Sequence, residues 1–249
     1  MTFKKVFNDL FKDELGLYGF QYNKKYGMHM RVVNNEIVQY ITFISVPSGS
    51  REHKAFQIYA GMQSVYSYSL KKEYLLMYAS VLSMYAYESI QNADYLMPYI
   101  YDEKNMYDTI RSALDRTKNV LIPIFDHVDD LSSYINLIKK IRIDILSDVD
   151  RFASNRNDAL VLLKVNNRDD FDDLLQIELD RVKKWLKEGK LGGTYQEQYE
   201  MLHSNIIERV ANARDKVYDN PDLYKKAMDE AERRKVSNLR ELRNNGVEI

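Results

Sequence analysis

Residues 2–62 combine one helical apolar pattern with three alternating patterns, and this stretch constrains the fold more than any other part of the chain. Its first segment repeats apolar side chains at helical spacing, namely Phe3, Val6, Phe7, Leu10 and Phe11. This spacing predicts an amphipathic helix. Thr2 is a candidate N-cap, and Gly16 and Gly19 are expected to end the helix.

Apolar and polar side chains then alternate in three successive segments, as in β-strands with one buried face. The segments are centred on residues 26–32, 38–46 and 56–62. Asn34-Asn35 separates the first two, and asparagine tolerates the positive φ angles of a tight hairpin turn. The pattern predicts an α+β fold in which an N-terminal helix packs on an antiparallel β-sheet with further helices.

The composition excludes several classes of protein. The chain of 249 residues has no cysteine, which excludes disulfides, thiolate catalysis and cysteine-based zinc sites. Lys and Arg (36) nearly balance Asp and Glu (37), so no nucleic-acid or membrane partner is expected. No secretion-signal pattern occurs, and no apolar run approaches the roughly 20 residues of a membrane helix. We therefore expect a soluble, cytoplasmic protein.

The second half of the chain has helical patterns. An apolar stripe begins at Met106, and Pro123 is expected to interrupt it because proline lacks a backbone N–H and clashes with the preceding turn. A polar stretch near residue 150 predicts a boundary between an α+β domain at 1–150 and an α-helical C-terminal module at 151–249. In that module, Asn220-Pro221 is typical of a helix start, with a capping side chain followed by proline.

Four stretches of this pattern resemble a known bacterial family. They are the opening helix ending in Gly19-Phe20, the strands Ile37–Ile41 and Phe56–Gly61, and the helix leading into Leu121–Phe125. Together they resemble domain-of-unknown-function family 4304 over roughly residues 1–140. The resemblance implies an α+β domain with an antiparallel sheet, and the family has no established activity from which functional residues could be transferred.

One cluster, Asp126-His127-Val128-Asp129-Asp130, holds three carboxylates and an imidazole. Such groups can bind a metal or share a proton, which makes Asp126, His127 and Asp129 weak catalytic candidates. The alternative is that Asp129 or Asp130 caps the helix that follows, where aspartate is favoured regardless of function. No glycine-rich loop precedes a helix, so neither a cofactor nor a metal is predicted.

The other histidines do not form a ligand pattern. His29 falls in the first predicted strand, His53 in a loop and His203 on a helix. None has a second histidine at a spacing of four, and each is interpreted as a surface or hydrogen-bonded residue.

Tyrosines are concentrated between positions 59 and 107, where the secondary structure is ambiguous from residue 63 to 100. An aromatic recognition patch is one interpretation, since tyrosine combines a large apolar ring with a polar tip. The alternative is that these rings occupy the rim of the sheet. The candidate binding residues are Tyr66, Tyr68, Tyr85, Tyr87, Tyr99 and Tyr101.

Two functions from different classes remain open at this point. The first is a non-catalytic protein-interaction protein of binding, accessory or immunity type, with a protein partner or a second copy of itself. The second is a small metal- or carboxylate-dependent enzyme with its site near Asp126–Asp130. The first is favoured because the sequence supplies no complete catalytic set.

Overall fold

The computed structural model describes residues 2–67, 69–73, 75, 98–134, 136–137 and 220–249. The chain divides into two compact units, one formed by residues 1–134 and 235–249 and the other by residues 135–234. Of the second unit, only residues 136–137 and 220–234 are described. The boundary predicted near residue 150 lies outside the described residues.

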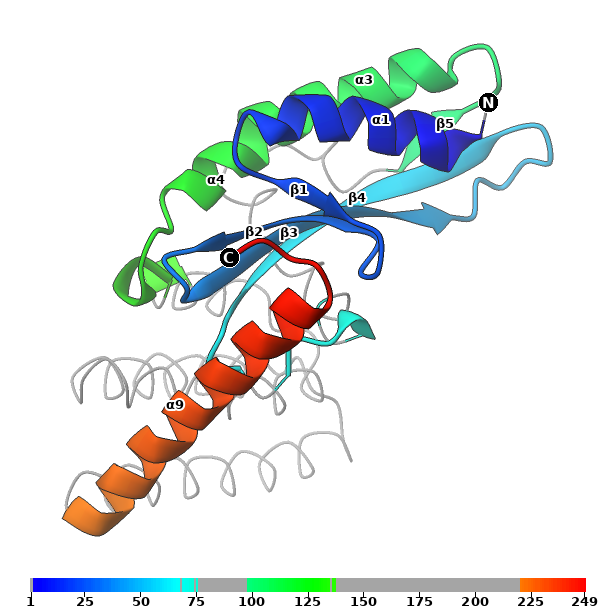
Figure 1. Cartoon of the computed structure of the whole chain (residues 1–249). Helices are drawn as coiled ribbons and strands as arrows, with labels where there is room; N and C mark the ends of the chain where they lie inside the picture. The colour runs from blue at the N-terminus through cyan, green and yellow to red at the C-terminus, as the bar shows by residue number, and fades with distance from the viewer. Residues whose placement is uncertain (1, 68, 74, 76–97, 135, 138–219) are drawn as a thin grey trace, which may run out of the picture. The chain divides into compact units, whose positions relative to one another are not determined.

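The first unit has the predicted α+β fold, with an N-terminal helix on an antiparallel sheet (Figure 1). Helix α1 (Phe3–Gly16) precedes five strands in the order β1-β2-β3-β4-β5. The strands are β1 (Gln21–Asn23), β2 (Met28–Val33), β3 (Ile37–Val46), β4 (Lys54–Ser64) and β5 (Tyr99–Tyr101). The three predicted strands are confirmed as β2, β3 and β4, whereas β1 and β5 are too short to give an alternating pattern.

The sheet is a meander in which each strand pairs antiparallel with the next along the chain. Asn34 and Asn35 have φ angles of 51° and 56°, which confirms the tight turn between β2 and β3. Strands β3 and β4 pair along their whole length, from Ile37 opposite Ser64 to Val46 opposite Ala55. The pairing of β3 with β2 ends at Ile41, so Thr42 to Val46 pair with β4 alone and form a projecting hairpin arm.

Helix α1 covers one face of the sheet with aromatic side chains. Its buried residues are Val6, Phe7, Phe11 and Leu15, at the spacing that the sequence predicts for its buried face. The Phe7 ring lies 3.9 Å from the Phe11 ring and 4.5 Å from the Phe43 ring of β3 (centroid distances). Thr2 occupies the N-cap position, but its side chain makes no capping hydrogen bond, contrary to its predicted role.

The opposite face of the sheet is packed around Tyr40 and Gly61, which lie opposite each other on β3 and β4. The Tyr40 hydroxyl donates to the backbone carbonyl of Leu75 at 2.8 Å. A Cβ atom at Gly61 would lie only 2.5 Å from that hydroxyl oxygen, so the absence of a side chain there gives the ring its space.

The C-terminal segment 235–249 also belongs to the first unit. Helix α9 (Pro221–Asn244) begins at the predicted Asn220-Pro221 pair, where the Asn220 side chain accepts a hydrogen bond from the Asp222 N–H. Within residues 235–249, Asn238 donates to the carbonyls of Val65 and Ser67, both at 2.8 Å. The Asn23 side chain donates to the Asn245 carbonyl at 2.8 Å, so both ends of the chain contribute to one unit.

Helix α3 (Met106–Arg116) lies beside α1 in Figure 1 and continues through a π-helical segment, η2 (Thr117–Leu121), into α4 (Ile122–Asp126). The regular α-helix is therefore interrupted before Pro123, as predicted, although the helical path continues through η2 into α4. Pro123 lies in the first turn of α4, where a missing N–H costs little, and the irregular hydrogen bonding falls in η2 before it. Among the described residues, no helix is long and apolar enough to cross a membrane.

Candidate functional site

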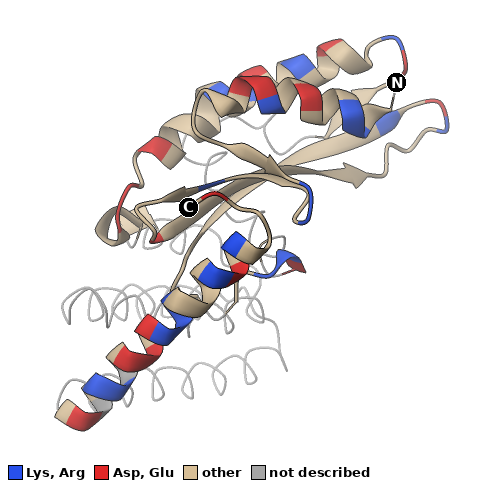
Figure 2. Cartoon of the chain, viewed as in Figure 1, with Lys and Arg blue, Asp and Glu red and all other residues tan. Residues whose placement is uncertain are grey.

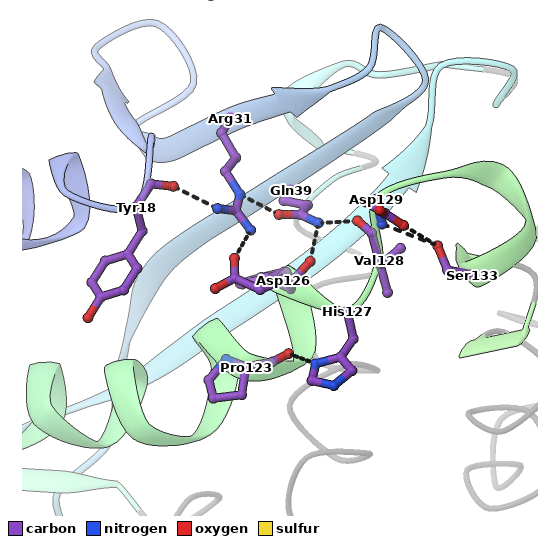
Figure 3. A network of polar contacts seen from close by, with 10 residues as sticks. Tyr18, Arg31, Gln39, Pro123, Asp126, His127, Val128, Asp129 and Ser133 are labelled. Atoms are coloured by element: carbon purple, nitrogen blue, oxygen red, sulfur yellow. Dashed lines mark hydrogen bonds and ion pairs between the residues drawn. The ribbon is translucent and has the colours of Figure 1, made fainter.

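A polar network joins the sheet to the end of α4 and contains the predicted acidic cluster (Figure 3). Its centre is Arg31 of β2, which points to the α4 side of the sheet. The Arg31 guanidinium donates to the Gln39 side-chain oxygen at 2.6 Å, to the Tyr18 carbonyl at 2.7 Å and to Asp126 Oδ1 at 2.6 Å. The same group lies 4.7 Å from the centroid of the Phe20 ring. Arg31 therefore ties four separate chain positions together.

Gln39 of β3 is the buried member of the network. Its side chain is fully buried, and its amide nitrogen donates to the carbonyls of Phe125 at 2.9 Å and Val128 at 3.0 Å. The Phe125 carbonyl lies in the last turn of α4 and the Val128 carbonyl just after it, where backbone acceptors lose their helical partners. Gln39 thus provides hydrogen-bond donors to carbonyls at the end of α4 and holds this end of the helix against β3.

The three predicted catalytic residues do not converge on one point (Figure 3). Asp126 is paired with Arg31, while the His127 ring turns back to the Pro123 carbonyl, which lies 2.6 Å from Nδ1. Asp129 contacts Ser133, with its N–H donating to the serine hydroxyl at 3.2 Å. Within the described part of the chain, no group of three or more His, Asp or Glu side chains could hold a metal ion.

Asp130 has the capping role that the alternative interpretation assigns to it. Its Oδ1 accepts a hydrogen bond from the Ser133 N–H at 2.7 Å, at the start of the helical turn from Leu131. This backbone hydrogen bond and a second one from the Ser133 hydroxyl lower the pKa of Asp130 below its ordinary value. The Asp130 N–H in turn donates to the Ser133 hydroxyl at 3.1 Å, so the two residues cap the turn reciprocally, as in a capping box.

The tyrosine candidates have different surroundings. Tyr66 is 5% exposed and lies against Lys235, with 5.6 Å between its ring centroid and the Lys235 Nζ. Tyr101 is 8% exposed and stacks on Phe3 at 4.7 Å. Tyr99 is partly exposed, and Tyr68, Tyr85 and Tyr87 lie outside the described residues. The rings of Tyr66 and Tyr101 thus contribute to packing.

An apolar surface lies on the hairpin arm, on the face away from α1. Alternate side chains of a strand point to opposite faces, and Phe43 contacts α1, so Ile44 and Val46 point the other way. Across the sheet, Val46 lies opposite Ala55, and Ala55 lies opposite Ile100 of β5. Ile100 is 55% exposed. We define the arm surface as the partly or largely exposed residues Ile44, Val46, Tyr59 and Ile100, together with the one polar residue among them, Gln57, which lies opposite Ile44.

This surface was not predicted as such from the sequence, because the alternation of β3 and β4 shows which residues share a face but not which end of that face is covered.

Comparison with protein-family models, with curated protein sequences and with solved structures finds no match. The resemblance to family 4304 therefore remains a prediction.

The charged side chains of α1, α3 and α9 are of both signs and are interspersed (Figure 2). On α9, Glu230 forms ion pairs with Arg233 at 2.5 Å and Arg234 at 3.1 Å. Lys118 likewise pairs with Glu14 at 2.6 Å, between η2 and α1. These helices therefore present mixed charge, which suits a solvated surface better than a binding site for a polyanion.

Proposed function

We propose that this chain is a non-catalytic protein-interaction protein that binds its partner through the arm surface. The observation that carries the proposal is the 55% exposure of Ile100 on the same sheet face as the partly exposed Val46, with the buried Ala55 between them. Exposed apolar side chains that stand alone are common, but neighbouring ones that share a sheet face are typical of contact surfaces.

The position of the arm supports this proposal. The arm projects past β2, so its residues from Thr42 onward have a strand neighbour on the β4 side only, as far as the structure describes them. On its other face, Phe43 packs against Phe3 and Phe7, with ring centroids 5.0 and 4.5 Å away. The arm is therefore held by α1 and can offer its second face without a large loss of conformational entropy on binding.

The contacts of the acidic cluster give further support. Asp126 is engaged by Arg31, and Asp130 caps a helical turn, so both carboxylates have roles in holding the chain. An enzyme site near Asp126–Asp130 stays a prediction, and no observation on the described residues favours it.

The experiment compares one charged substitution on the arm surface with a matched one elsewhere. Ile100→Lys places a cation on the surface, whereas Leu17→Lys does the same at an exposed apolar residue (81% exposed) just after α1. Each tagged protein is gently purified from its own host and analysed by native mass spectrometry. We expect a partner at fixed stoichiometry with the parent chain and with Leu17→Lys, and its loss with Ile100→Lys.

Two outcomes contradict the proposal. One is a parent chain that carries no protein at fixed stoichiometry, and the other is a partner that Ile100→Lys retains. The far-UV circular dichroism of Ile100→Lys must match that of the parent chain, so that loss of the partner reports on the surface. A second copy of the chain counts as a partner if Ile100→Lys dissociates it.

A further inference from the structure

His29 of β2 is enclosed by aromatic rings from α1 and β1. Its side chain is 1% exposed. The centroid of its ring lies 5.1 Å from that of Tyr22, 5.9 Å from that of Phe11 and 6.4 Å from that of Phe7. The sequence-based interpretation as a surface or hydrogen-bonded histidine is therefore wrong.

Neither ring nitrogen of His29 has a hydrogen-bond partner in the described part of the chain. The groups packed against it are apolar: Phe7 and Phe11 from α1, and Ile41, its direct neighbour on β3. Tyr22 of β1 is the one titratable side chain in ring contact with it among the described residues. As far as the described residues show, the imidazole is thus enclosed without a carboxylate that could balance a positive charge.

Burial alone lowers the pKa of His29 from 6.5 to about 4. The neutral ring is tolerated in this enclosure, whereas the imidazolium needs water or a carboxylate. Water can reach the ring in two ways, by separating β2 from its neighbours or by moving α1. Separating β2 breaks backbone hydrogen bonds to both β1 and β3, whereas α1 is held by its buried side chains and by the ion pair of Glu14 with Lys118. Because α1 supplies two of the three rings around His29, moving it opens the enclosure while the sheet stays intact.

We propose that His29 is an acid-sensitive latch, and that protonation of its imidazole releases α1 from the sheet. In the closed state, with α1 packed on the sheet, the enclosed His29 imidazole binds a proton only weakly. In the open state, with α1 released, it binds a proton with the affinity of an ordinary histidine. Below pH 6.5 the open state therefore gains population, and the gain stops once the pH falls below about 4, where both states are protonated. Opening exposes Phe7 and Phe11, which are buried while the His29 imidazole is neutral and α1 stays packed on the sheet.

The size of the effect follows from the two affinities. With a pKa of 6.5 in the open state and about 4 in the closed state, the open population rises about 20-fold between pH 7 and pH 5. Hydrogen exchange measured by mass spectrometry reports this population directly, once the rates are corrected for the intrinsic pH dependence of exchange. We expect α1 amides to be less protected than those of β3 and β4 at pH 7, because they exchange by local opening, and we expect their protection to fall about 20-fold between pH 7 and pH 5.

The decisive variant is His29→Leu, which fills the enclosure without a titratable group. We expect it to abolish the pH dependence of α1 protection. His53→Gln is the matched control, because His53 is exposed in the loop before β4, and it should behave as the parent chain. The proposal is overturned if α1 amides are as well protected as those of β3 and β4 at pH 7, if α1 protection does not change with pH, or if His29→Leu keeps the pH dependence.

A measurement on the parent chain keeps the test valid should His29→Leu fail to fold. The imidazole Cε1–H resonance of His29 can be followed by NMR from pH 7 downward. We expect no titration above about pH 5. A titration midpoint near 6.5 would contradict the enclosure itself and with it the latch.

Discussion

Replacing Gln39 with leucine tests whether the network at the end of α4 is structural. Leucine has a similar volume and keeps the apolar contacts of a fully buried side chain, but it removes every polar contact of Gln39. Three hydrogen bonds are lost: those donated to the carbonyls of Phe125 and Val128, and the one accepted from Arg31.

The expected cost follows from these three bonds. A buried hydrogen bond contributes about 1 kcal/mol to stability, and a partner left unsatisfied raises the cost of losing it. Arg31 keeps its bonds to the Tyr18 carbonyl and Asp126, and the Phe125 carbonyl keeps the Val128 N–H at 3.1 Å, but the Val128 carbonyl loses the Gln39 donor that faces it. Gln39→Leu should therefore lower the free energy of unfolding by roughly 3 kcal/mol.

Asp126→Asn is the matched comparison within the same network. The Asp126 side chain is 50% exposed, and an ion pair at such a position contributes roughly 0.2–1 kcal/mol. Asparagine also keeps an oxygen that can accept from Arg31. This substitution should therefore cost less than about 1 kcal/mol, even though Asp126 is the residue that catalysis would need.

The assay is urea denaturation followed by hydrogen exchange of peptides from β2 and β3, which reports on the first unit alone. Its midpoint should shift far more for Gln39→Leu than for Asp126→Asn, with similar denaturant slopes. The reasoning is refuted if Gln39→Leu costs less than about 1 kcal/mol, or if Asp126→Asn costs as much as Gln39→Leu.

Two further predictions concern packing and pH. Gly61→Ala should destabilise the first unit by about 1–3 kcal/mol in the same denaturation assay, because its Cβ would lie 2.5 Å from the Tyr40 hydroxyl. Gly16→Ala, at the end of α1 with open space around it, should instead stabilise by roughly 0.5–1 kcal/mol, and equal effects would contradict the packing argument. The hydrogen bond from Lys118 lowers the pKa of Glu14 below 4.5, so their contact stabilises the fold above that pH and is lost as the pH falls. Lys118→Met should raise the Glu14 pKa in an NMR titration, and an unchanged value would show that the pair does not form in solution.

The elements that could be predicted are those with a local cause. The sequence shows the alternating pattern of β2, β3 and β4, and it shows the asparagine pair that forms the turn between β2 and β3. Both features could be predicted because each depends only on residues that are close together in the chain. Strands β1 and β5 each have three residues and form because β2 and β4 offer backbone partners. No local pattern of three residues can show such pairing.

The candidate site likewise combines features with a local cause, which could be predicted, and features that depend on residues far apart in the sequence, which could not. The capping role of Asp130 depends on the helix start beside it and could be inferred from sequence. The pairing of Asp126 with Arg31 joins residues 95 positions apart, so nothing near Asp126 indicates it. The enclosure of His29 likewise depends on Phe7 and Phe11 reaching it from another element, and an alternating strand pattern shows its face but not its hydrogen-bond partners.

The contacts of residues 235–249 have a consequence for how the protein is made. Asn245 meets Asn23 across 222 positions, and Asn238 meets Val65 across 173. During synthesis the sheet is available long before these residues are, since chains are made from the N-terminus at about 5–20 residues per second. Until then the carbonyls of Val65 and Ser67 lack the Asn238 donor. The first unit is thus begun by an early part of the chain, and its packing is completed only when residues 173 to 222 positions later have been made.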